Sequence, residues 1–112
     1  MSEIRELINL IIQFRDERNW GKFHNPKDIA LSLSLEASEL LENFQWKSSD
    51  EAIANKYQNL KEELADVVIY ALLFAHETGI DIIQAVEEKV QKNSNNYPVE
   101  KAHGVIKKYT EL

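Results

Sequence analysis

Two pairs of acidic residues stand in the most apolar parts of this 112-residue chain. The first pair is Glu36 and Glu39, and the second is Glu63 and Asp66. Residues three apart lie on one face of a helix, so each pair presents two carboxylates side by side. Burying four carboxylates together is costly, because desolvation and mutual repulsion both oppose it. A divalent cation would offset that cost, and the pattern therefore predicts a metal site.

The ligand types narrow the choice of metal. Carboxylate oxygens without a neighbouring His or Cys favour Mg²⁺, with Mn²⁺ as its substitute. Di-iron carboxylate proteins place Glu-x-x-His on two helices. Neither acid pair here has His at that position, so iron oxygenase chemistry is not expected. The pattern alone leaves one alternative open, in which the acids are solvated or paired with a lysine such as Lys61.

The composition indicates one domain over residues 1–112. A hydrophobic fraction of 44% with 29% charged residues is typical of a soluble globular protein. The net charge of −6 argues against a nucleic-acid polymer or an anionic membrane as the main partner. The chain has no cysteine, which excludes disulfides and thiol nucleophiles. Arg5 and Glu6 interrupt the apolar N-terminus, so no signal peptide is expected and the predicted location is cytoplasmic.

Helices should position the acid pairs, because the chain has only three Gly and two Pro and no Asn-Gly turn. The first helix is expected over 3–18 with Ser2 as its cap, and the second from Asn25 to about residue 46. A third, capped by Ser49 or Asp50, should reach about residue 78. A fourth should run from Asp81 to about residue 93, and a short helix is expected within 99–112.

The segment 40–62 is long enough to end one helix and bring the next back antiparallel, so that the acid pairs face each other. The predicted fold class is therefore all-α, with an antiparallel four-helix bundle as the protomer. The first half of the second helix and the second half of the third are apolar almost all round. A surface helix of a monomer would show a polar face. We therefore predict a homo-oligomer with an extensive interface that includes the third helix.

Further motifs surround the four acids. Trp20 lies in Arg18-Asn19-Trp20-Gly21-Lys22-Phe23-His24-Asn25-Pro26, Trp46 ends Phe44-Gln45-Trp46, and Lys89 precedes Asn93 and Tyr97-Pro98. From about Arg18 to Gly104 the chain resembles the MazG-like family of all-α nucleoside triphosphate pyrophosphohydrolases. The resemblance is strongest to the small single-domain branch that includes dCTP pyrophosphatases. The family signature, Glu-x-x-Glu and then Glu-x-x-Asp, is matched at all four acids.

The resemblance implies hydrolysis of a (deoxy)nucleoside triphosphate between its α- and β-phosphates, giving a monophosphate and pyrophosphate, in nucleotide-pool housecleaning. It implies that Glu36, Glu39, Glu63 and Asp66 are the Mg²⁺ ligands and catalytic acids. The substrate-binding residues that it implies are the aromatic walls Trp20 and Trp46, the polar residues Tyr70 and Asn93, the phosphate contact Lys89, and His24 beside the presumed pocket. A dimer, or a tetramer of two dimers, is the assembly that it suggests.

One residue departs from the pattern. Members of this branch commonly carry Arg before Tyr-Pro, and this chain has Asn96, which puts one phosphate contact in doubt. The sequence leaves open the preferred base, the number of metal ions, and which acid, if any, acts as general base. Two other functions also stay open: a non-catalytic nucleotide-binding or helical interaction module, and hydrolysis of dUTP or phosphoribosyl-ATP on a similar bundle.

Overall fold

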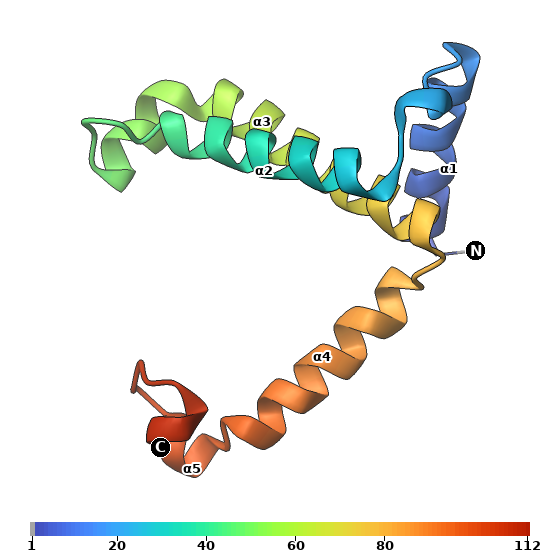
Figure 1. Cartoon of the computed structure of the whole chain (residues 1–112). Helices are drawn as coiled ribbons and strands as arrows, with labels where there is room; N and C mark the ends of the chain where they lie inside the picture. The colour runs from blue at the N-terminus through green and yellow to red at the C-terminus, as the bar shows by residue number, and fades with distance from the viewer. Residues whose placement is uncertain (1) are drawn as a thin grey trace. The chain divides into compact units, whose positions relative to one another are not determined.

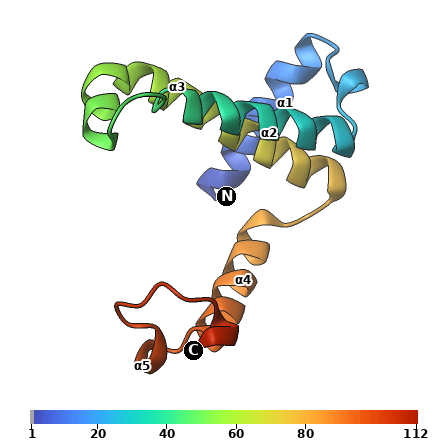
Figure 2. The ribbon, with the colours of Figure 1, turned by 60° about the vertical axis from the view of Figure 1, so that its left-hand side comes forward.

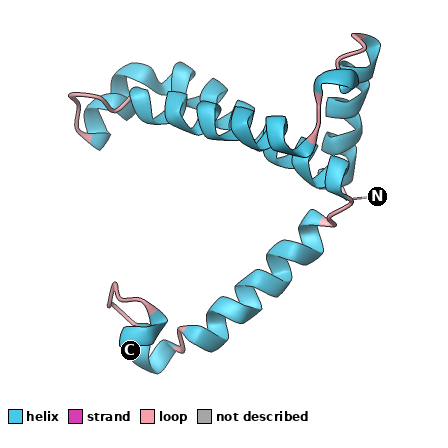
Figure 3. Cartoon of the chain, in the orientation of Figure 1, coloured by secondary structure: helices cyan, strands magenta, loops and turns pink. Residues whose placement is uncertain are grey.

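The computed structural model describes residues 2–112, and these form helices joined by loops, without a strand (Figure 3). The all-α class predicted from the sequence is confirmed. The chain divides into two compact units, one up to Ile80 and one from Asp81 to Leu112. The first holds α1 (Glu3–Glu17), the 3-10 turn η1 (Gly21–Phe23), α2 (Pro26–Glu42) and α3 (Ser49–Thr78). The second holds α4 (Ile82–Asn96), α5 (Val99–Ala102) and η2 (Tyr109–Glu111).

Side-chain caps fix where the four long helices begin. Each cap accepts a hydrogen bond from the backbone N–H three residues later, and the caps are Ser2, Asn25, Ser48 and Asp81. Such caps satisfy amide groups that have no partner inside the helix. Three of the four agree with the sequence. The third helix starts one or two residues earlier than predicted, because the Ser48 side chain takes the cap in place of Ser49 or Asp50.

The helix ends follow the sequence less closely. Gly79, in the left-handed conformation with φ of 73°, ends α3 where predicted. By contrast, α2 ends at Glu42 and not near residue 46, since residues 43–47 form tight turns in which the amides of residues 43, 44, 45 and 47 each bond three residues back. Helix α4 continues three residues beyond the expected 93, to Asn96. Helix α3 is interrupted at Lys56, whose φ of −124° and ψ of 20° are not helical.

In the first unit, α2 and α3 lie side by side in opposite directions, and α1 packs across the C-terminal half of α3 (Figures 1 and 2). The hydrophobic core of the described chain is small, and its buried side chains are Ile11, Ile29, Ala52, Leu72, Leu73 and Ala75. Many large apolar side chains of α2 and α3 are exposed instead, including Leu35, Leu41, Leu64 and Val68. The helices expected to be apolar all round therefore leave much of that surface uncovered.

The second unit is built on α4, and a short tail follows it. Tyr97, just after α4, packs edge to face against Tyr109, with ring centroids 5.9 Å apart. Because α4 belongs to this unit, the packing of four helices into one bundle stays a prediction. No described helix combines the length and apolar character needed to cross a membrane.

Candidate active site

An acidic cluster forms where α2 passes α3. The carboxylates of Glu36, Glu39 and Glu63 each offer an oxygen, and these oxygens lie within 4.8 Å of one another. The first two residues are one turn apart on α2, and the antiparallel pairing brings the third against them from α3. The structure thus brings together three of the four acids singled out by the sequence.

The cluster holds charge that the protein itself does not neutralise. Oε2 of Glu36 and Oε2 of Glu63 are buried and have no hydrogen-bond partner among residues 2–112. Burial, reinforced by the interaction with Glu39, raises the pKa of Glu36 from 4.5 to about 7. Burial and Glu39 also raise the pKa of Glu63. At neutral pH, protons therefore occupy part of a site that a cation would otherwise stabilise.

These features fit a hard divalent cation. The donor set consists of carboxylate oxygens, as Mg²⁺ and Mn²⁺ prefer, and two of the oxygens are buried and unpaired. Within the part of the chain that the structure describes, no lysine or arginine forms an ion pair with these acids. Neutralisation by Lys61, the alternative that the sequence left open, is therefore not seen.

A mostly apolar cavity of about 540 Å³ lies between α1, the loop after it, and α3. Its volume falls within the range of roughly 300–1,000 Å³ typical of small-molecule sites. It is lined by Leu10, Ile11, Phe14, Arg15, Trp20, His24, Asp66, Ile69, Tyr70 and Leu73. Four residues implicated by the sequence, Trp20, His24, Asp66 and Tyr70, thus meet in one cavity.

The loop after α1 holds Trp20 and His24 in the cavity wall. The Trp20 amide donates to the carbonyl of Arg15 at 3.1 Å, and its ring meets Phe14 edge to face at 5.7 Å. Asn19, with φ of 54°, provides the left-handed turn that this path requires. His24 follows η1, and its Nδ1 is buried without a partner among the described residues. The cavity wall therefore includes a flat indole ring and an imidazole.

Asp66 and Tyr70 connect the cavity with the acidic cluster. Asp66 is not among the three acids whose oxygens converge, but its charge contributes to the raised pKa of Glu36. Burial raises the pKa of the Tyr70 hydroxyl, and the charges of Glu36 and Asp66 raise it further. The apolar cavity and the acids are thus electrostatic neighbours on the same face of α3.

Three of the implicated residues are not brought into this cavity. Trp46 is 92% exposed and lies beyond the C-terminus of α2, whereas Trp20 precedes its N-terminus. The 17 residues of α2 span about 25 Å, so the two rings of one protomer cannot stack on one base. Lys89 and Asn93 are exposed on α4, in the other unit.

The sequence interpretation missed Arg15, a buried charged residue in the cavity wall. A signal was present, because Arg15 continues the apolar stripe of Ile8 and Ile11 at helical spacing. A charge on the buried face of an amphipathic helix needs a partner or a ligand.

The fold and the site together define an all-α protein with a carboxylate cluster beside an apolar cavity. Comparison with known proteins shows the family to which it belongs. Residues 31–112 match the MazG-like family. The dCTP pyrophosphatase 1 of Rattus norvegicus is 38% identical over 97% of this chain and 67% of its own length, and that of Homo sapiens is 36% identical over the same shares. The crystal structure of a pyrophosphatase from Archaeoglobus fulgidus is 42% identical, with a TM-score of 0.82 over 88% of this chain and 94% of that one. The chain belongs to the MazG-like family, as its sequence predicted.

Proposed function

We propose that the protein hydrolyses dCTP, or a closely related or modified deoxynucleotide, between the α- and β-phosphates. The broader prediction is confirmed: the chain is a nucleoside triphosphate pyrophosphohydrolase of the housecleaning type, as its family and its dCTP pyrophosphatase relatives indicate. The observation that carries the proposal is an acidic cluster beside an apolar cavity. Such a pair of sites suits a ligand with a polyanionic tail and a flat apolar head.

Glu36, Glu39, Glu63 and Asp66 would hold Mg²⁺, with Mn²⁺ as a substitute. The unpaired buried oxygens of Glu36 and Glu63 support this, since a cation would satisfy both. When bound, the ion would neutralise phosphate charge and polarise a phosphoryl oxygen. The acids themselves fix where the triphosphate lies, because two of them are one turn apart on α2 and two on α3.

The cavity would receive the base. The ring of Trp20 provides a stacking surface, a contact worth roughly 1–3 kcal/mol per base in related sites. Stacking tolerates any base, so selectivity has to come from hydrogen-bonding groups. His24 and Tyr70 line the same wall, so their imidazole and hydroxyl groups can supply them.

A second copy of the chain would complete the site. Trp46 is exposed and has a φ of 62°, an unfavourable conformation for a bulky residue that indicates a functional constraint. Since it lies about 25 Å from the loop of Trp20, we propose that it reaches the base pocket of a neighbouring protomer. The exposed side chains Leu64 and Val68 support an interface along α3. The proposed assembly is a cytoplasmic dimer or dimer of dimers of single-domain four-helix bundles.

Helix α4 would supply the contacts to the phosphates. Lys89 and Asn93 are four residues apart on α4, so they share one face. Lys89 brings a positive charge and Asn93 a neutral donor. Asn96, the last residue of α4, replaces the arginine common at this position and leaves the phosphate site with one charge fewer.

The test is pyrophosphate release from a panel of nucleotides, including dCTP, dUTP and phosphoribosyl-ATP, with Mg²⁺ and with EDTA. We expect Mg²⁺-dependent release that is fastest with dCTP or a modified form of it. The matched variants are Glu39→Gln in the cluster and Glu42→Gln, an exposed acid on the same helix outside it. Binding of nucleotide without pyrophosphate release would instead identify a non-catalytic module. Fastest release from dUTP or phosphoribosyl-ATP would reassign the substrate.

A further inference from the structure

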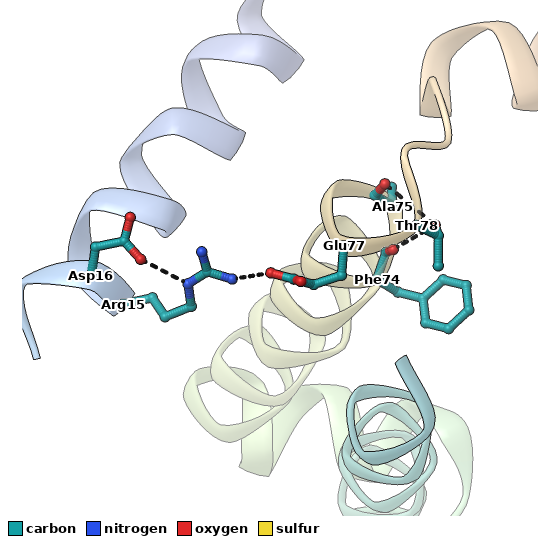
Figure 4. Close-up of polar contacts among 6 residues, drawn as sticks. All are labelled: Arg15, Asp16, Phe74, Ala75, Glu77 and Thr78. Atoms are coloured by element: carbon teal, nitrogen blue, oxygen red, sulfur yellow. Dashed lines mark hydrogen bonds and ion pairs between the residues drawn. The ribbon is translucent and has the colours of Figure 1, made fainter. Parts of the chain in front are cut away.

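Arg15 is a charged side chain held inside the proposed base pocket. It is 9% exposed and lines the cavity with Trp20 and Tyr70. Its Nε donates to Oδ1 of Asp16 at 3.1 Å, and its Nη1 donates to Oε1 of Glu77, which comes from α3 (Figure 4). The guanidinium therefore joins α1 to α3 at the wall of the cavity.

The position of this guanidinium is fixed from several sides. Its two acidic partners hold separate nitrogens, and Gly21 lies beside it. A Cβ at Gly21 would lie 3.3 Å from Nε and 3.7 Å from Nη2, so a larger residue would press on the group. A donor held in this way is preorganised for a ligand, and little side-chain entropy is lost on binding.

The third nitrogen, Nη2, is left for a ligand. No hydrogen bond joins it to any residue in 2–112, and Figure 4 shows dashed lines only from the other two nitrogens. A guanidinium has N–H donors and no acceptor, so a molecule bound against Nη2 pairs with it by offering an acceptor. Nη2 is not one of the buried side-chain atoms that lack a partner, so it keeps exposed surface that a ligand can reach.

We propose that Arg15 is a base-specificity residue whose Nη2 donates a hydrogen bond to ring atom N3 of a cytosine stacked on Trp20. This rests on the proposed function, since it assumes that the cavity receives the base of a nucleotide. In cytosine, N3 is an acceptor and lies beside the acceptor O2. In uracil and thymine, N3 carries a hydrogen and would face the guanidinium as a second donor. Arg15 thus favours cytosine over both other pyrimidines.

The experiment pairs a variant with a matched substrate. Arg15→Met removes the donor and keeps an unbranched apolar chain, while 3-deaza-dCTP replaces N3 by C–H and removes the acceptor. Hydrogen bonds to charged groups correspond to roughly 10- to 100-fold. We therefore expect wild-type kcat/KM to be 10- to 100-fold higher for dCTP than for 3-deaza-dCTP, and Arg15→Met to abolish that preference. Discrimination against dUTP should fall in the same variant.

Glu77→Gln is the control. It breaks the ion pair with α3 but keeps the guanidinium, so it should lower stability while the preference for dCTP persists. If Arg15→Met lowers kcat/KM equally for dCTP and 3-deaza-dCTP, the residue only holds α1 against α3 and the proposal is wrong. Should Arg15→Met fail to fold, the wild type and Glu77→Gln still test the proposal. Equal kcat/KM of the wild type for dCTP and 3-deaza-dCTP would overturn the proposal. A preference for dCTP of 10-fold or more that survives in Glu77→Gln would support it. Failure of the proposed function would appear separately, as the absence of pyrophosphate release from every substrate. In that case the affinities for dCTP and 3-deaza-dCTP are compared by binding calorimetry, and the same preference for dCTP and its loss in Arg15→Met are expected.

Discussion

Replacing Glu36 by Gln should stabilise the metal-free protein at pH 8 and change its stability little at pH 5. In the folded protein, burial and then the neighbouring Glu39 raise the pKa of Glu36 from 4.5 to about 7. The folded state therefore binds this proton more tightly than the unfolded state. The resulting stabilisation is fully present below pH 4.5 and is lost as the pH rises through about 7. Gln is neutral at every pH and avoids this loss.

The size of the effect follows from the same shift. A change of pKa from 4.5 to about 7 corresponds to roughly 3 kcal/mol if it acted on one isolated group. Glu36 is partly exposed and shares its site with Glu39 and Glu63, so solvent screening and coupled titration reduce the difference to about 1–2 kcal/mol. For a chain of this length that is about 5–10 °C in Tm.

The assay is thermal unfolding in EDTA from pH 5 to pH 8.5, at one fixed protein concentration so that any oligomer contributes equally. As the pH rises, the Tm of the wild type should fall more than the Tm of Glu36→Gln. The Tm of Glu42→Gln should fall as much as that of the wild type. Addition of Mg²⁺ at pH 8 should raise the Tm of the wild type more than that of Glu36→Gln. Parallel pH curves for wild type and Glu36→Gln would refute the electrostatic reasoning.

Three further predictions concern the acids, the assembly and a helix cap. Glu39→Gln should abolish pyrophosphate release while the circular dichroism spectrum keeps its helical form, and near-wild-type hydrolysis would show that the acid is not catalytic. Trp20→Ala and Trp46→Ala should each reduce kcat/KM, and mixed oligomers of the two should regain activity because one pocket then has both rings; mixtures as inactive as their parents would contradict a shared site. Ser48→Ala should lower the free energy of unfolding by about 1 kcal/mol in urea titrations, because it removes the cap of α3. Ser49→Ala should change it little, and equal losses would argue against the Ser48 cap.

Local features of the fold could be read from the sequence because they depend on near neighbours. Ser2, Asn25 and Asp81 each cap a helix by reaching an amide three residues away, and Gly79 ends α3 through its own backbone freedom. The end of α2 could not be read in this way. Residues 43–47 have no glycine or proline, and only the tight turns between the two long helices end α2 at Glu42.

The part of the candidate site that lies on α2 and α3 could be predicted from the sequence. The spacing of Glu36 and Glu39, and an antiparallel return of the chain, suffice to bring Glu63 beside them. The distance between Trp20 and Trp46 follows from the helix predicted from Asn25 to about residue 46, because that helix stands between the two rings. The ion pair of Arg15 with Glu77 was hidden, since it joins residues that are distant in the sequence.

Binding calorimetry with Mg²⁺ tests the central claim most directly. The wild type, mixed with a non-hydrolysable α,β-imido analogue of dCTP, should take up Mg²⁺ with a measurable heat, and Glu63→Gln should lose most of that uptake. Mn²⁺ should replace Mg²⁺ in the same titration. Absence of uptake of either ion by the wild type, with and without the analogue, would contradict a metal site at the acidic cluster.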